Sequence, residues 1–177
     1  MEVIAIPSIP KQSHLYTMAD EVISSLFDLR PEQWNLPPFD DWIEGTLPIE
    51  PWHIGGPVIK GFGPNLSTEG YSSLLSEYPS GVYFGWAGVA KRGIYKMVMS
   101  IGWNPYFDNA EKTIEPWLLH EFEDDFYGEE LRLVVVAKIH EDGRIAESAL
   151  ELPTYSKYKD DMYLKSLLEM DTSSNPS

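Results

Sequence analysis

Residues 81–89 read GVYFGWAGV, residues 93–105 read GIYKMVMSIGWNP, residues 112–122 read KTIEPWLLHEF and residues 125–136 read DFYGEELRLVVV. These runs are rich in β-branched and aromatic residues, and short glycine, asparagine or acidic segments separate them. Such runs predict three or four strands joined by short turns. Because no helical segments alternate with them, we expect a mostly β fold, a small and mostly antiparallel barrel.

The overall composition narrows the function classes. The 177 residues carry a formal net charge of −15, which disfavours nucleic acid and anionic membrane as partners. The chain has no cysteine, so disulfides and thiolate metal sites are excluded. No apolar run is long enough to cross a bilayer and no signal peptide is recognisable, so we expect a cytoplasmic protein. We also expect it to be a monomer.

The N-terminal residues predict few regular elements. Residues 2–6 read as a short strand for which no partner is obvious nearby. Thr17 starts a capping-box-like sequence, which predicts a helix ending near Arg30. Residues 31–57 are rich in proline, tryptophan and acids, which is typical of a linker, here with one helical turn.

The C-terminal residues predict one helix and a tail. Residues 138–150 have helical spacing, and Gly143 indicates that the helix proper begins after it. We therefore expect three parts: an N-terminal extension over residues 1–50, a barrel over 51–165 and a disordered tail over 166–177.

Glu115 is the first candidate for chemistry, because it lies inside a strand-like apolar run between Ile114 and the bulky pair Pro116 and Trp117. Burying a carboxylate is costly because its charge is desolvated. One interpretation is an ion pair with a lysine or arginine at a strand edge. The other is a general base that accepts a hydroxyl proton, with its pKa set by its apolar flanks.

Three further features are weaker signals. Residues 61–63 form a glycine turn, which either brings backbone N–H groups close to a phosphate or is only a turn. His120 lies five residues after Glu115, on the opposite face of a regular strand unless the strand ends first, and a lone histidine is more often structural than a ligand. The acidic residues between 121 and 130 are interpreted as a solvated loop rather than a metal cage.

The string SGVYFGWAGVAKRGIYKMVMSIGWNPYF, followed by EKTIEPWLLHEFEDDFYGEELRLVVV, closely resembles riboflavin kinase (flavokinase). The strings GPVIKGFG at residues 56–63 and ELPTYSKYKDD at residues 151–161 are similar to that family's first strand and C-terminal segment. The resemblance covers residues 52–164. The residues before it are similar to the end of the phosphatase domain and the linker of two-domain riboflavin kinase/FMN phosphatases, so the phosphatase body is expected to be missing.

The resemblance implies a six-stranded antiparallel Greek-key barrel. It also implies ATP-dependent phosphorylation of the riboflavin 5′-hydroxyl to make FMN, with Mg²⁺ or another divalent metal bound to ATP. Glu115 matches the family's catalytic base, and Gly61 matches its phosphate-loop glycine. Three further residues match positions that line the ATP site: Leu118, His120 and Tyr127.

Two departures from the family pattern predict impaired activity. Asn65 matches the asparagine of a Pro-Thr-Ala-Asn motif that helps to hold the metal, but the motif's threonine and a basic flap after Gly63 have no counterpart. After Val136 the family's flavin arch is also missing, and the chain passes directly to residues 137–140, which resemble the helix beyond the arch. The alternatives are an inactive barrel that binds nucleotide or flavin weakly, an FMN phosphatase and a flavin-dependent oxidoreductase.

Overall fold

The computed structural model places the chain in two compact units, residues 1–47 and 48–177, and each is described by itself. Gly61 and residues 104–111 lie outside the described residues, as do residues 170–177 of the predicted tail. The described residues are 3–6, 15–23, 29–37, 46–60, 64–67, 70–71, 75, 78–103, 112–139 and 143–169.

In the first unit, the short strands β1 (Ile4–Ala5) and β2 (Glu21–Val22) pair in parallel. Asp20 supports the pair, because its carboxylate accepts a hydrogen bond from Val3 N at 2.7 Å while its own backbone N donates to Val3 O at 2.8 Å. The predicted N-terminal strand therefore has a partner. The prediction of a helix from Thr17 is wrong for residues 21–22, which form β2. The helical turn expected in the linker is confirmed as the 3-10 helix η3 (Pro31–Trp34).

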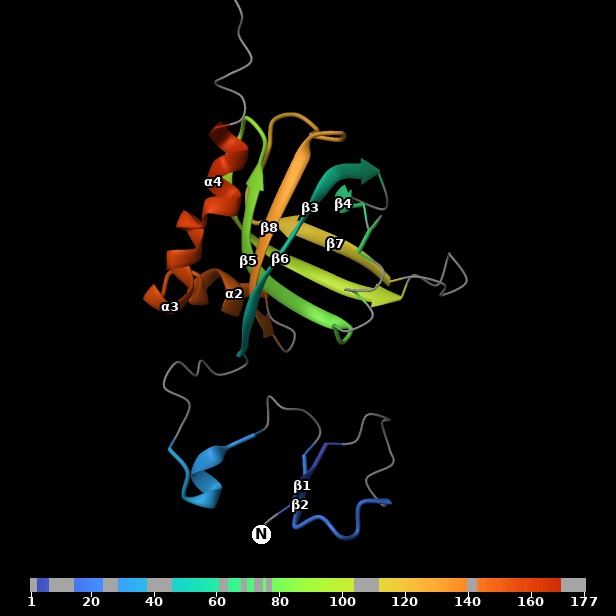
Figure 1. The fold of residues 1–177 in the computed structure, drawn as a ribbon, viewed down its shortest axis with the longest axis vertical. Helices are drawn as coiled ribbons and strands as arrows, with labels where there is room; N and C mark the ends of the chain where they lie inside the picture. Colours follow the sequence, from blue (N-terminus) through green and yellow to red (C-terminus); the bar gives the residue numbers. More distant parts are fainter. Residues whose placement is uncertain are drawn as a thin grey trace, which may run out of the picture. The chain divides into compact units, whose positions relative to one another are not determined.

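The second unit is a closed six-stranded barrel with the neighbour order β3-β4-β7-β6-β5-β8 (Figure 1). The strands are β3 (Thr46–Lys60), β4 (Pro64–Leu66), β5 (Gly81–Val89), β6 (Gly93–Trp103), β7 (Lys112–Leu118) and β8 (Glu130–Ile139). The recorded registers are all antiparallel. The connections β4–β5 and β7–β8 reach strands that are not neighbours, as in a Greek key. The predicted antiparallel barrel is confirmed.

β3 is longer than the sequence indicates. The proline-rich composition predicts a linker through residue 57, whereas β3 begins at Thr46 and includes three prolines. Burial along the strand explains the difference, because Trp52, Ile54 and Val58 are buried with the two-residue period of a strand. The apolar area that these side chains bury outweighs the poor strand propensity of proline.

β8 continues through residues 137–139, which the sequence assigns to the start of a helix. Its register against β5 skips Val136, because the residues on either side of it pair with Gly85 and Phe84. Val136 is thus the extra residue of a β-bulge. The chain accommodates the junction after Val136 by extending the last strand, and the barrel stays closed.

In the described residues after β8 there are four short helices: α2 (Gly143–Ala149), α3 (Pro153–Ser156), η5 (Lys157–Asp160) and α4 (Met162–Glu169). They lie on one side of the barrel, with α4 against β5 and β8 and α2 against β6 and β8 (Figure 1). The helix expected after Gly143 is confirmed. Residues 166–169 belong to α4, although the sequence places them in the tail.

The core lies inside the barrel, where side chains from all six strands meet. Among the most buried are Ile54, Leu66, Ala87, Met97, Ile114 and Leu133. Among the described residues, the helices that follow β8 pack against the outer faces of β5, β6 and β8. No helix among the described residues is long and apolar enough to cross a membrane.

Candidate active site

β7 presents alternate side chains to the two faces of the sheet. Ile114, Pro116 and Leu118 are buried, whereas Glu115 is exposed and the Trp117 side chain is 73% exposed. The expectation that Glu115 is desolvated is therefore wrong, because its nearest apolar neighbours in sequence point to the opposite face. The Glu115 carboxylate is instead open to solvent and accessible to a substrate on the outer face of β7.

The strand registers bring Asn65 and Glu115 together on this outer face. Leu66 of β4 pairs with Ile114 of β7 in antiparallel order, and continuing this register by one residue on each strand sets Asn65 opposite Glu115. On the other side of β7, Ser100 of β6 pairs with Glu115. Residues directly opposite each other on one face have Cβ atoms about 4.5–5.5 Å apart. The predicted base and the predicted metal ligand are therefore neighbours, although 50 residues of sequence separate them.

The chain that leaves β7 lines an open pocket of about 660 Å³. Residues 116–122 and Phe126 form its walls, so the predicted nucleotide contacts Leu118 and His120 belong to it. Tyr127, the third predicted contact, borders a smaller pocket of about 80 Å³ that shares Phe122 and Phe126 with the larger one. The three predicted positions thus gather around a single loop, the one that joins β7 to β8.

Aromatic contacts hold His120 in the pocket wall. Its ring stacks on Tyr95 with the centroids 4.4 Å apart and the planes 27° apart, and it meets Phe122 edge-on at 4.8 Å. Phe122 lies 4.8 Å from Phe126, centroid to centroid. Because β7 ends at Leu118, strand alternation does not restrict His120. The wall is therefore a packed aromatic surface, of the kind on which a nucleobase stacks.

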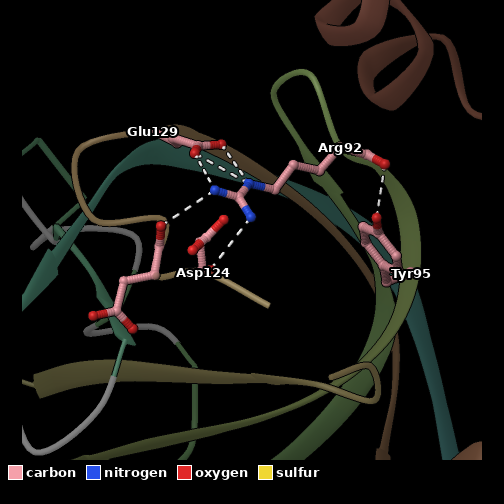
Figure 2. A network of polar contacts seen from close by, with 5 residues as sticks. Arg92, Tyr95, Asp124 and Glu129 are labelled. Carbon is pink, nitrogen blue, oxygen red and sulfur yellow. Dashed lines mark hydrogen bonds and ion pairs between the residues drawn. The ribbon is translucent and has the colours of Figure 1, made fainter. Parts of the chain in front are cut away.

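Arg92, in the turn between β5 and β6, ties the loop to the barrel (Figure 2). Its guanidinium donates to both carboxylate oxygens of Glu129, at 2.7 Å for the shortest bond, and to the carbonyl oxygens of Asp124 and Asp125 at 3.3 and 3.2 Å. The hydrogen bonds to Glu129 raise the pKa of Arg92 above its usual value, and the negative charges of Glu129 and Asp124 add to the effect. The guanidinium thus stays charged and fixes the loop at three residues.

The sequence did not single out Arg92, in the turn before β6, or Tyr95, near the start of β6, which support the pocket wall. The sequence signals only the turn itself, through Gly93, and in the structure Lys91, two residues earlier, adopts a positive φ of 64°. Phe122 and Phe126 carry a weak signal, because two apolar residues stand four positions apart in an otherwise acidic loop. The acidic side chains of that loop are largely exposed, in agreement with the prediction of a solvated face.

Comparisons with known proteins identify the family. Residues 49–153 match the Flavokinase family, described as riboflavin kinase, and this match covers more than half of the chain. The chain belongs to the riboflavin kinase family. The resemblance inferred from the strand sequences is thereby confirmed, and the matched residues run from within β3 to the first residue of α3.

The chain covers different shares of the length of its relatives in the riboflavin kinase family. The bifunctional riboflavin kinase/FMN phosphatase of Arabidopsis thaliana is 64% identical over 189 residues, which include 92% of this chain and 50% of that protein. The chain thus spans about half the length of that relative. The riboflavin kinases of Homo sapiens and Mus musculus are each 33% identical over 141 residues, covering 65% of this chain and 91% of those enzymes.

A solved structure supports the fold independently. The riboflavin kinase of Trypanosoma brucei superimposes with a TM-score of 0.56 at 23% identity, covering 73% of this chain and 89% of that one.

The lengths of the sequence matches show that both relatives contain positions without a counterpart in this chain. The Arabidopsis match spans 189 positions, whereas 92% of 177 residues is about 163, so about 26 positions lack a residue of this chain. The human match yields the same number, because 65% of 177 is about 115 and the match spans 141 positions.

Proposed function

We propose that this chain is a riboflavin kinase, which transfers the γ-phosphoryl group of ATP to the 5′-hydroxyl of riboflavin and produces FMN and ADP. One observation carries the proposal: within a barrel of the riboflavin kinase family, the pairing of Leu66 with Ile114 sets Asn65 next to the exposed Glu115. The pocket that begins one residue after Glu115, with its aromatic wall, is suited to the nucleotide. As part of the proposal, the enzyme works as a cytoplasmic monomer.

In the proposed reaction, Glu115 acts as the general base. The 5′-oxygen of riboflavin forms a bond to the γ-phosphorus as the bond from that phosphorus to the departing ADP oxygen breaks, and the hydroxyl proton moves to the Glu115 carboxylate. An exposed carboxylate suits this role, because a bulky alcohol substrate reaches it from solvent. His120, Leu118 and Tyr127 would bind the nucleotide, and Gly61 would approach its phosphates.

The donor set of the outer face fits a divalent cation bound together with ATP. The Asn65 amide oxygen is a hard oxygen donor, and Mg²⁺ is commonly held by one or two protein ligands plus nucleotide phosphates and water. Among the described residues, no three histidine, cysteine, aspartate or glutamate side chains gather into a metal cluster. When bound with ATP, the metal supplies positive charge that offsets the charge of the phosphates.

We further propose that turnover is slow. About 26 aligned positions of the relatives lack a counterpart in this chain, as expected if two loops, the metal-binding flap and the flavin arch, are absent. Loss of such partners reduces kcat by about 10²- to 10³-fold per donor. A second candidate, a barrel that binds nucleotide or flavin without turnover, is favoured by the same missing positions and by the uncovered Trp117 side chain.

The deciding experiment is FMN formation by the full chain. Riboflavin and Mg-ATP are incubated with the protein, and FMN is separated chromatographically and measured by fluorescence, with a chelator-treated sample as the control. Metal-dependent FMN formation supports the kinase proposal. Calorimetric binding of Mg-ADP or riboflavin without FMN formation supports the second candidate. If the protein shows no binding and no turnover, both candidates are refuted.

A further inference from the structure

Two side chains, Arg92 in the turn between β5 and β6 and Tyr95 near the start of β6, support the pocket wall from behind. The Arg92 guanidinium lies 5.7 Å from the ring centroids of both Phe122 and Phe126, and both phenylalanines line the pocket. The Tyr95 hydroxyl donates to the carbonyl oxygen of Arg92 at 2.7 Å (Figure 2), and the Tyr95 ring carries His120 on its face. Every aromatic residue of the wall except Trp117 therefore touches Arg92 or Tyr95.

The charge of the loop makes this support necessary. The segment from Leu119 to Glu129 contains five acidic residues and, apart from His120, no basic one. Like charges at this density repel each other and favour an extended, solvated chain. Arg92 supplies a positive charge from outside the segment. The N–H groups of its guanidinium bind one carboxylate and two backbone carbonyls of the loop.

We propose that Arg92 is a positioning residue of the nucleotide pocket: it folds the acidic loop back onto the barrel, so that His120 and Phe122 form a rigid wall. The inference rests on the proposed function for the identity of the ligand. Arg92 itself lines neither pocket. It acts through the loop, by limiting the fraction of molecules in which the wall is assembled.

The planar guanidinium is what this role requires. Arginine presents several N–H donors in a rigid plane that also lies flat against aromatic rings, whereas lysine presents one compact ammonium group. Arg92→Lys thus keeps the positive charge and removes the fork that bridges Glu129, Asp124 and Asp125. A purely electrostatic role would survive this substitution, and a positioning role would not.

Arg132→Lys is the matched control. Arg132 also bridges two acceptors, because its Nη1 donates to Tyr163 O at 3.0 Å and to Ser166 Oγ at 2.8 Å, and its guanidinium lies 4.9 Å from the Tyr163 ring. These bonds join β8 to α4, and Arg132 lines neither pocket. The control therefore repeats the chemistry of the substitution at a structural position away from the pocket.

The experiment compares wild type, Arg92→Lys and Arg132→Lys in the full chain, using Mg-ADP calorimetry, steady-state kinetics and amide hydrogen exchange. If the assembled loop falls to roughly 10–30% of molecules, the apparent Kd for Mg-ADP rises about three- to tenfold. We expect this rise, with a matching rise in KM for ATP, an unchanged kcat at saturating ATP and an unchanged KM for riboflavin. Exchange should accelerate only in residues 119–129, and Arg132→Lys should leave both the Kd and that exchange unchanged.

Equal Kd values for Arg92→Lys and wild type would overturn the inference, as would equal rises in both variants. If the wild type makes no FMN and does not bind Mg-ADP, the proposed function fails. Hydrogen exchange then decides the role of Arg92 separately. Faster exchange of residues 119–129 in Arg92→Lys alone supports the positioning role, and unchanged exchange refutes it.

Discussion

Replacing Glu115 by glutamine separates catalysis from stability, because the structure places this carboxylate on an open face. The change keeps the shape of the side chain and removes its ability to accept a proton. A surface substitution away from packing or caps changes the free energy of unfolding by at most about 0.5 kcal/mol. Had Glu115 been buried and paired, as the apolar run suggests, its loss would instead cost several kcal/mol, roughly 3–5.

The expected effect on rate is much larger. General-base catalysis contributes about 10²- to 10⁴-fold to kcat, which corresponds to about 2.7–5.4 kcal/mol of activation free energy. The assay measures FMN formation with Mg-ATP and riboflavin, and thermal unfolding of the same samples measures stability. Glu147→Gln, an exposed change on α2, is the matched control and should alter neither quantity.

Two results would refute this reasoning. If Glu115→Gln keeps more than about a tenth of the wild-type kcat, Glu115 is not the base, since that loss lies below the general-base range. If Glu115→Gln lowers the midpoint of thermal unfolding by more than about 4 °C, roughly 1 kcal/mol in a domain of this size, the carboxylate has a structural partner. Unchanged stability with a lost rate is the outcome that the geometry predicts.

Three further predictions concern the barrel. Gly85→Ala should destabilise the fold by about 3 kcal/mol in urea unfolding, because a Cβ atom at this bulge would overlap the backbone of β8; wild-type stability would contradict the bulge. Burial, assisted by Tyr78, raises the pKa of Tyr83 to about 12 from the usual tyrosine value of about 10, so Tyr83 contributes stability below pH 10 that is lost as the pH rises to about 12. The difference in unfolding free energy between wild type and Tyr83→Phe, which also loses the hydrogen bond to Pro79 O, should shrink over this interval; a constant difference would contradict the shift. Trp86→Phe removes the buried hydrogen bond from Nε1 to Tyr155 O at 2.9 Å and should cost about 1–3 kcal/mol by the same urea assay, which an unchanged midpoint would contradict.

Local sequence patterns predicted the elements whose burial follows a simple period. The strands that became β5, β6, β7 and β8 were recognisable from their β-branched and aromatic runs, and the helix after Gly143 from its spacing and its glycine. Where local propensity and tertiary burial disagree, the sequence misled. β3 contains three prolines and was interpreted as a linker, although Trp52 and Ile54 are buried in the barrel.

The site shows the same division. Residue types and strings of sequence were enough to nominate Asn65, Glu115, Leu118, His120 and Tyr127, because strand sequences identify the family. They did not predict Arg92, because a surface arginine in a turn carries no local sign of a partner more than 30 residues away. They also placed Glu115 in an apolar environment, because a list of neighbours along the chain does not say which face each neighbour occupies.

The sequence by itself determined that the chain is a β protein of the riboflavin kinase family with one acid in its third long strand run, because strand periodicity and family strings are local properties. Only the tertiary structure decided that this acid is open to solvent, that Asn65 stands opposite it, and that Arg92 holds the loop beside it. The physical reason is that strand register and long-range hydrogen bonds depend on how distant segments close the barrel, and no single segment carries that information.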